Sequence, residues 1–107
     1  MYTLNLIPKT TAPVIVSCSE GDQILRAFRF QFMNGDSLWN IDCDSVTMEV
    51  SNGVSIPGTV ADNSAVFDCS EEMSAKPGIF FGKIEFLKNA EKIHSASFLF
   101  KVERKPA

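Results

Sequence analysis

Hydrophobic and polar positions alternate along most of this chain with the two-residue period of a β-strand. The longest such run spans residues 78–102 and is interrupted at residues 88–91 by the largely polar sequence Lys-Asn-Ala-Glu. Alternate side chains of a strand point to opposite faces, so each half of the run has one apolar face. These apolar positions are Phe80, Gly82, Ile84 and Phe86 in the first half, and Ala96, Phe98, Phe100 and Val102 in the second. The pattern predicts a long antiparallel hairpin that needs a second sheet to cover it.

Shorter apolar and alternating runs predict further strands along the rest of the chain. Their predicted ranges are residues 2–7, 14–18, 24–33, 45–51, 54–60 and 64–69. Phe28, Phe30 and Phe32 share one face of the third run. Pro57 interrupts the run 54–60, which predicts an edge strand or a bulged one because proline has no N–H for a sheet ladder.

Turn signals separate these runs and complete the predicted fold class. Asn34-Gly35, Asn52-Gly53, Asp62-Asn63 and Pro77-Gly78 stand between the strands. Short strands at this spacing are typical of an all-β protein, an immunoglobulin-like antiparallel β-sandwich of about seven to nine strands. Residues 70–76 carry at most one short helical turn, with Ser70 as its N-cap.

Length and charge restrict the classes of function. The 107 residues, 45% of them hydrophobic, are enough for one domain, 1–107, with its own core. The net charge of −3, with acidic and basic residues intermixed, offers no footprint for nucleic acid and no polybasic run for a membrane surface. No apolar run approaches the ~18 residues of a membrane span, and the N-terminus does not resemble a secretion signal. We therefore expect a protein made in a cytosol.

Cysteine and histidine provide no predicted catalytic or metal site. Cys18, Cys43 and Cys69 are widely spaced and form no Cys-x-x-Cys motif, so we expect reduced residues in or beside the core. His94 is the single histidine and stands near the start of a strand, where a structural role is expected rather than that of a general base.

Acidic and amide side chains in the loops could in principle offer oxygen ligands to calcium. They are Asp36, Asp42, Asp44 and Asp62, with Asn34, Asn40 and Asn63. Their spacing does not match a regular oxygen-rich calcium loop, so solvated loops are the better interpretation. The sequence also lacks a phosphate-binding glycine loop and a nucleophile elbow. We predict a non-enzyme with no cofactor and no metal.

A specific order of turns and strands extends over residues 20–102, with Pro77-Gly78 before the penultimate strand. The segments that carry it are Gly21-Asp22, 26–30, Asn34-Gly35-Asp36, 45–48, 54–60, 66–67, 76–86 and 93–102. This order resembles the N-terminal domain of phage baseplate upper proteins, the family that joins receptor-binding proteins to the tail tip. The resemblance implies an immunoglobulin-like sandwich, and it carries over no catalytic residue.

The resemblance implies a structural module of a phage or prophage tail. Its expected partners are other baseplate and tail proteins, and a homo-oligomer is left open. Its expected location is the virion, in the tail baseplate, after assembly in the cytoplasm of the bacterial host. The alternative is a bacterial adhesion or carbohydrate-binding sandwich. That alternative usually has an export signal and several exposed aromatic residues.

Outward-facing hydrophobic residues of the predicted hairpin are the candidate protein-contact surface. Phe81, Leu87 and Leu99 lie opposite its predicted core faces, and Trp39 stands in the segment 37–42, where it either tucks under the edge of the sandwich or forms a ligand platform. If the three cluster on an exposed face, they indicate a subunit contact. The competing interpretation is that the strands predicted at residues 2–7 and 14–18 cover them.

Overall fold

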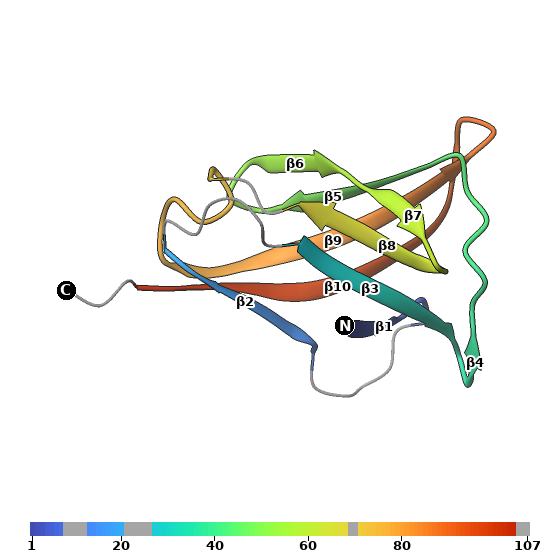
Figure 1. Ribbon diagram of the computed structural model, residues 1–107, viewed down its shortest axis with the longest axis horizontal. Coiled ribbons are helices and arrows are strands. Elements are labelled where there is room, and N and C mark those ends of the chain that lie inside the picture. The colour runs from blue at the N-terminus through green and yellow to red at the C-terminus, as the bar shows by residue number, and fades with distance from the viewer. Residues whose placement is uncertain (8–12, 21–26, 69–70, 105–107) are drawn as a thin grey trace.

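A computed structural model describes residues 1–7, 13–20, 27–68 and 71–104. The described residues form ten strands and no helix (Figure 1). The strands are β1 (Tyr2–Asn5), β2 (Ile15–Ser19), β3 (Ala27–Asn34), β4 (Ser37–Leu38), β5 (Ser45–Val50), β6 (Val54–Pro57), β7 (Thr59–Ala61), β8 (Ser64–Asp68), β9 (Gly78–Lys88) and β10 (Glu91–Glu103). The predicted all-β sandwich is confirmed.

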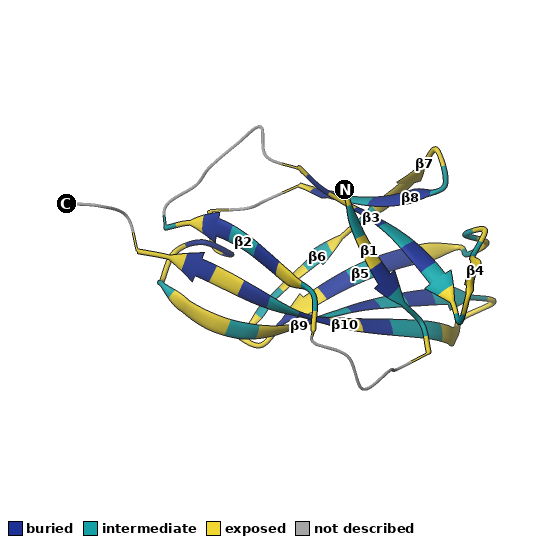
Figure 2. Cartoon of the chain, turned by 90° about the horizontal axis from the view of Figure 1, so that it is seen from below, coloured by how far each residue is buried: buried dark blue, intermediate teal, exposed yellow. Residues whose placement is uncertain are grey.

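Two sheets face each other, as the view in Figure 2 shows. Sheet A has the order β1-β3-β8-β7, with β4 also paired to β3, and sheet B has the order β2-β10-β9-β5-β6. The prediction of antiparallel sheets is wrong at two places, because β1 is parallel to β3 and β2 is parallel to β10. Neither pair is joined by a hairpin, and the alternation of a strand does not reveal the direction of a distant partner.

The predicted hairpin of residues 78–102 is confirmed as β9 and β10, the most extensive strand pair. Its turn consists of Asn89 and Ala90, which both have positive φ angles of 53° and 62°. This is the two-residue turn whose twist matches a hairpin. Along both strands buried and exposed residues alternate (Figure 2), and the register slips at one bulge between Lys92 and His94.

Phenylalanine rings from both sheets form the centre of the core. Phe30 in β3 is fully buried, and its ring centre lies 5.9 Å from that of Phe67 in sheet A and 5.5 Å from that of Phe98 in sheet B. Phe28, Phe32, Phe86 and Phe100 are also buried. The alternation of β3, β9 and β10 therefore predicted the two inner faces correctly.

The chain changes sheet at Pro57 and Gly58. β6 pairs with β5 in sheet B, while β7 pairs with β8 in sheet A, and both strands lie at sheet edges. The prediction that Pro57 marks an edge strand is confirmed. Gly58 allows the crossing because a Cβ atom there would lie 2.5 Å from the ring of Phe67. The single predicted strand 54–60 thus becomes two, and the two-residue β4 brings the total above the seven to nine expected.

The predicted helical turn near residues 70–76 is a turn without a helix. The N–H of Ser74 donates to the carbonyl oxygen of Glu71 at 3.3 Å, and no helix is formed among the described residues. Met73 is fully buried, so the segment folds back onto the core. The proposed cap Ser70 lies outside the described residues.

Candidate protein-contact surface

The outer face of sheet B carries mainly small polar and charged side chains. On β9 and β10 the outward positions are Lys83 and Glu85, and Ser95, Ser97 and Lys101; on β5 they are Thr47 and Glu49. Such a face needs no covering layer, because one side of a sheet can be solvated. Hydrophobic side chains on this face are therefore the feature that calls for an explanation.

Four hydrophobic residues gather at one end of this face. Leu99 pairs with Phe81 across β10 and β9 and with Ile15 across β10 and β2, so three apolar side chains stand in one row. Ile79 precedes Phe81 on the same face of β9. The exposed fractions are 75% for Phe81, 67% for Ile79 and 55% for Ile15, while Leu99 is half-buried between its neighbours. We refer to Ile15, Ile79, Phe81 and Leu99 as the Phe81 patch.

The N-terminal strands do not cover this patch. β1 belongs to sheet A, and β2 extends sheet B at its edge instead of crossing its outer face. The expectation of coverage by these strands is therefore wrong. Ile15 itself comes from β2, so the strand adds to the apolar row.

Leu87 and Trp39 lie away from the Phe81 patch. Leu87 shares the outer face of β9 but stands six residues from Phe81, about 20 Å along the strand. It is half-buried. Trp39 is half-buried at the other side of sheet B, with its ring centre 4.9 Å from those of Phe86 and His94. Trp39 thus packs under the sandwich edge, one of the two arrangements expected from the sequence.

Ion pairs order the charged part of the outer face. Glu85 contacts Lys83 at 3.1 Å and Lys92 at 3.0 Å, and Lys101 contacts Glu103 at 3.9 Å. The hydrogen bond from Lys92, followed by that from Lys83, lowers the pKa of Glu85 below its ordinary value of 4.5. Beside these pairs, a shallow groove of about 300 Å³ borders Phe81. Its lining residues are Glu49, Val50, Ser51, Phe81, Gly82, Lys83 and Ser97.

Replacing Glu85 with glutamine is expected to lower the free energy of unfolding by about 0.5 kcal/mol at neutral pH, because this charge network is near the surface. A carboxyl group whose pKa is lowered by folding stabilises the protein above its unfolded pKa, here 4.5. That contribution is lost as the pH falls from this value through the lower folded pKa. Urea unfolding at neutral pH and near pH ~3 would measure the difference. Glu49→Gln, which removes a carboxylate that forms no ion pair within the described residues, is the control. A loss that stays the same at both pH values would contradict the assignment.

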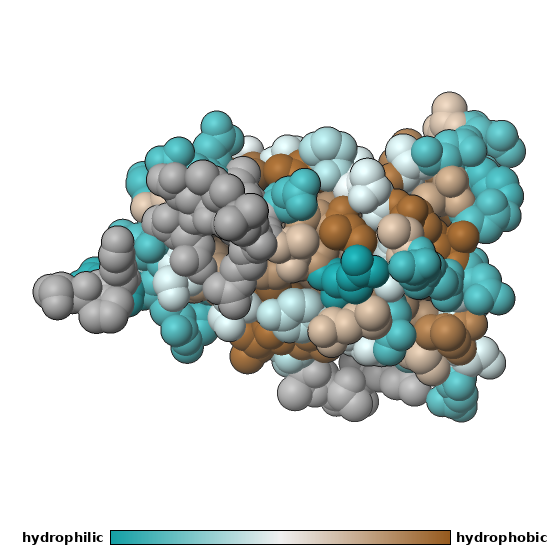
Figure 3. Space-filling model, viewed as in Figure 1, coloured by the Kyte–Doolittle hydropathy of each residue, from teal (hydrophilic) through white to brown (hydrophobic). Residues whose placement is uncertain are grey.

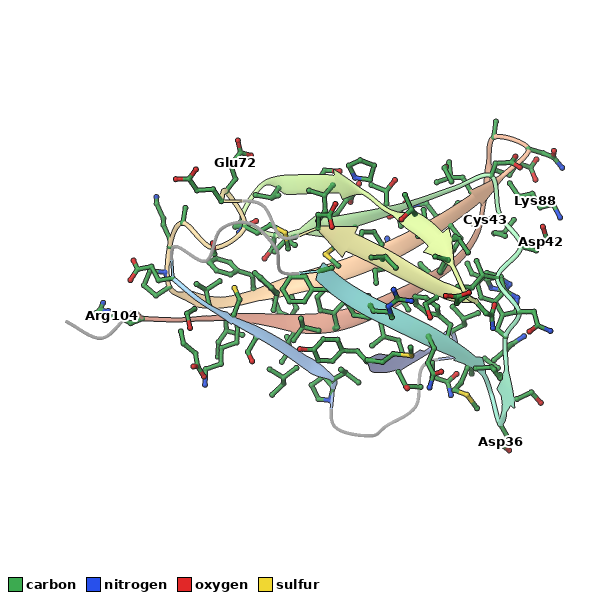
Figure 4. The ribbon with its side chains drawn as sticks, in the orientation of Figure 1. Asp36, Asp42, Cys43, Glu72, Lys88 and Arg104 are labelled. Atoms are coloured by element: carbon green, nitrogen blue, oxygen red, sulfur yellow. The ribbon has the colours of Figure 1, made fainter. Side chains whose placement is uncertain are left out.

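The acidic loop before β5 contacts the tip of the long hairpin through an ion pair and a hydrogen bond. Asp42 forms an ion pair with Lys88, and the N–H of Asn89 donates to a carboxylate oxygen of Asp44 at 2.7 Å. Figure 4 shows Asp42 and Lys88 together at this end, with Asp36 further away at the β3–β4 turn. Two of the candidate calcium ligands thus serve the hairpin instead. Within the described residues no three histidine, cysteine or acidic side chains are placed to hold a metal ion.

Two of the three cysteines lie in the part of the chain that the structure describes. Cys18 is buried in the core, and Cys43 is half-buried. Burial, followed by the nearby charges of Asp42 and Asp44, raises the pKa of the Cys43 thiol above its ordinary value of 9.0. The thiol is therefore protonated at neutral pH, which is unsuited to a nucleophile. Cys69 lies outside the described residues.

The other broad face of the molecule is the side on which β3, β7 and β8 lie. Hydrophilic and hydrophobic residues are interspersed on this side (Figure 3). In the part of the chain that the structure describes, no helix has the length and apolar character to cross a membrane.

Fold and surface together define a two-layer all-β sandwich with an exposed apolar patch on sheet B. Among solved structures, the chain is similar to one described as the N-terminal domain of phage TP901-1 ORF48. The likeness has a TM-score of 0.71 and covers 94% of each chain, at 16% sequence identity. No protein-family model matches the chain, and no curated protein matches it. At this identity the likeness establishes a shared fold, which agrees with the resemblance seen in the sequence.

Proposed function

We propose that this chain is a non-enzymatic structural module of a phage or prophage tail baseplate. In this role the domain docks on the baseplate core and links it to receptor-binding or adhesin components. The observation that carries the proposal is the similarity to a phage domain over 94% of both chains. The order of turns and strands in the sequence supports the same family independently of the coordinates. Such a module resides in the virion and is assembled in the cytoplasm of the bacterial host.

The Phe81 patch is the proposed protein-contact surface of this module. Single exposed hydrophobic residues are common. Here, hydrophobic residues of three neighbouring strands stand in one row with a fourth beside them, so they form a continuous apolar area. A large aromatic ring at its centre is the type of residue that dominates binding energy in protein interfaces. Phe81 and Leu99 thus remain in the proposed surface, Ile15 and Ile79 join it, and Leu87 and Trp39 lie outside it.

Co-purification tests the baseplate role. A tagged copy of the chain would be expressed together with the genes that neighbour it in its genome, and captured proteins would be identified by mass spectrometry. We expect a neighbouring tail or baseplate protein to be retained in a stoichiometric complex. The same tagged chain expressed without those genes is the control.

Two outcomes would contradict the baseplate role. One is the absence of any tail protein from the captured material although the chain is folded and soluble. The other is saturable binding to a defined sugar on a glycan array, which would favour a carbohydrate-binding module instead.

A further inference from the structure

Residues that pair across neighbouring strands form rows across the outer face of sheet B. The apolar row contains Ile15, Leu99 and Phe81, and the rows on either side of it contain charged residues. The apolar row continues directly after the end of β5 with the uncharged Ser51, whose hydroxyl oxygen accepts a hydrogen bond from the N–H of Phe81 at 2.9 Å. In the next row toward the C-terminal end of β10, Lys101 pairs with Ile79. In the next row in the opposite direction, Ser97 pairs with Lys83. On β9 and β10 the uncharged row is therefore bounded on each side by one lysine and one uncharged residue, and Glu49 of β5 stands next to Lys83 in its row.

A twofold axis along the apolar row makes this face complementary to itself. Such an axis places each residue of the row opposite its own copy, and the row carries no charge that would repel. It also exchanges the two flanking rows, so Lys83 on β9 meets Ile79 of the copy, and Lys101 on β10 meets Ser97 of the copy. Neither lysine meets a lysine, and both keep the glutamate partners of their own chain. The aliphatic stem of Lys83 can pack on Ile79 while its ammonium group stays solvated.

The area of the overlap agrees with a weak contact. Because the axis passes through Phe81, the fourth residue of β9, two copies overlap over about seven residues of this strand and over β2, β10, β9 and the end of β5. At about 4.8 Å between strands and 3.3 Å per residue, this is roughly 20 Å by 23 Å, or about 450 Å² for each copy, in the range of small, transient interfaces. Flat faces of two sheets can pack directly on one another with aligned strands.

We infer that the Phe81 patch binds a second copy of this chain through a twofold symmetric contact centred on Phe81. The inference deepens the proposed contact role of this surface by naming its partner, and it depends on that role but not on the identity of the baseplate proteins. In an assembly with several copies of the domain, this contact would hold neighbouring copies together while other surfaces remain available to different proteins.

Self-association of the purified chain tests the inference. In sedimentation-velocity experiments from ~5 to ~500 µM, we expect the wild-type chain to pass from monomer to dimer. Phe81→Glu places a like charge opposite itself and removes the central ring, so its dissociation constant is expected to rise at least about 30-fold. Thr59→Glu, a change at an exposed residue of β7 in the other sheet, is the control and is expected to dimerise like the wild type. A wild-type chain that stays monomeric throughout would overturn the inference.

A charge exchange separates a symmetric contact from other forms of association. Phe81→Glu and Phe81→Lys are each expected to be monomeric, while an equimolar mixture of the two is expected to form a mixed dimer because opposite charges then face each other. Failure of the mixture to associate, while the wild type dimerises, would rule out the twofold contact at Phe81. The dimerisation experiment uses only the purified chain. Dimerisation without capture of tail proteins would therefore contradict the baseplate role alone. Capture without dimerisation would overturn this inference alone.

Discussion

Replacing Phe30 with alanine is expected to lower the free energy of unfolding by about 4 kcal/mol, enough to unfold many domains of this size. Phe30 is fully buried and contacts aromatic rings from both sheets, with ring centres at 5.5 Å for Tyr2, 5.9 Å for Phe67 and 5.5 Å for Phe98. Truncation would leave a cavity between two sheets whose hydrogen-bond ladders restrict their approach. Urea unfolding followed by circular dichroism would measure the loss. If the variant does not fold, Phe30→Leu is expected to show a smaller loss in the same direction.

Phe81→Ala is the matched control for this prediction. The same side chain is removed from the outer face of sheet B, where it is 75% exposed, so the free energy of unfolding of the monomer is expected to change by less than about 0.5 kcal/mol. The measurement would be made at low protein concentration, so that self-association does not contribute. Equal losses at the two positions would contradict the assignment of inner and outer faces.

Gly82→Ala is expected to lower the free energy of unfolding by about 3 kcal/mol, although alanine is usually favoured over glycine within a strand. Gly82 faces the core from β9 and pairs with Phe98 of β10. A Cβ atom at this position would lie 2.3 Å from the nearest carbon of the Phe98 ring, and three ring carbons lie within 2.7 Å. The ring of Phe98 therefore occupies the space above the glycine, and the added methyl group would displace it. Thermal or urea unfolding would detect the change.

A double-mutant cycle checks the cause of this effect. Phe98→Leu removes the ring that the new methyl group would strike, so the cost of Gly82→Ala is expected to be at least about 1 kcal/mol smaller in that background. Ser97→Ala, the neighbouring outward position on β10, serves as a control with little expected effect. Additive losses for Gly82→Ala and Phe98→Leu would show that contact with this ring is not the reason.

Local pattern was sufficient to predict the elements of the fold that depend on sequence neighbours. The alternation of Phe28, Phe30 and Phe32, and that of β9 and β10, depends only on the two-residue period, so the inner faces followed from the sequence. The parallel placement of β1 and β2 did not, because strand direction is set by distant partners. The change of sheet at Gly58 also had no local signal beyond Pro57, since it depends on the close approach of Phe67.

The candidate surface was partly predictable for the same reason. Phe81 and Leu99 followed from the alternation of the hairpin, and the hairpin register places them side by side. Ile15 was missed because β2 is apolar on successive positions, and only its pairing with Leu99 shows which of them faces outward. Ile79 was also missed, although it stands two residues before Phe81 on β9 and the two-residue period places both side chains on the same face.

The side chains of the acidic loop illustrate a limit of motif reasoning. The spacing of Asp42 and Asp44 along the sequence favours solvated loop residues over metal ligands, and the structure shows that they contact Lys88 and the N–H of Asn89. These partners lie more than 40 residues away in the chain. Spacing along the sequence cannot reveal such a contact, although the fold makes it a simple consequence of where the hairpin tip lies.

Hydroxyl-radical footprinting of Phe81 provides the most direct test of its role as a contact residue. The oxidation rate of this ring would be measured by mass spectrometry in the dilute isolated chain and in intact phage particles that contain the chain, with the exposed Leu38 of β4 as an internal reference. We expect rapid oxidation of Phe81 in the isolated chain and a decrease of at least about fivefold in the particle, since a ring at the centre of an interface loses nearly all its exposure to water. Equal oxidation of Phe81 in both samples would contradict the assignment of this surface as a protein contact.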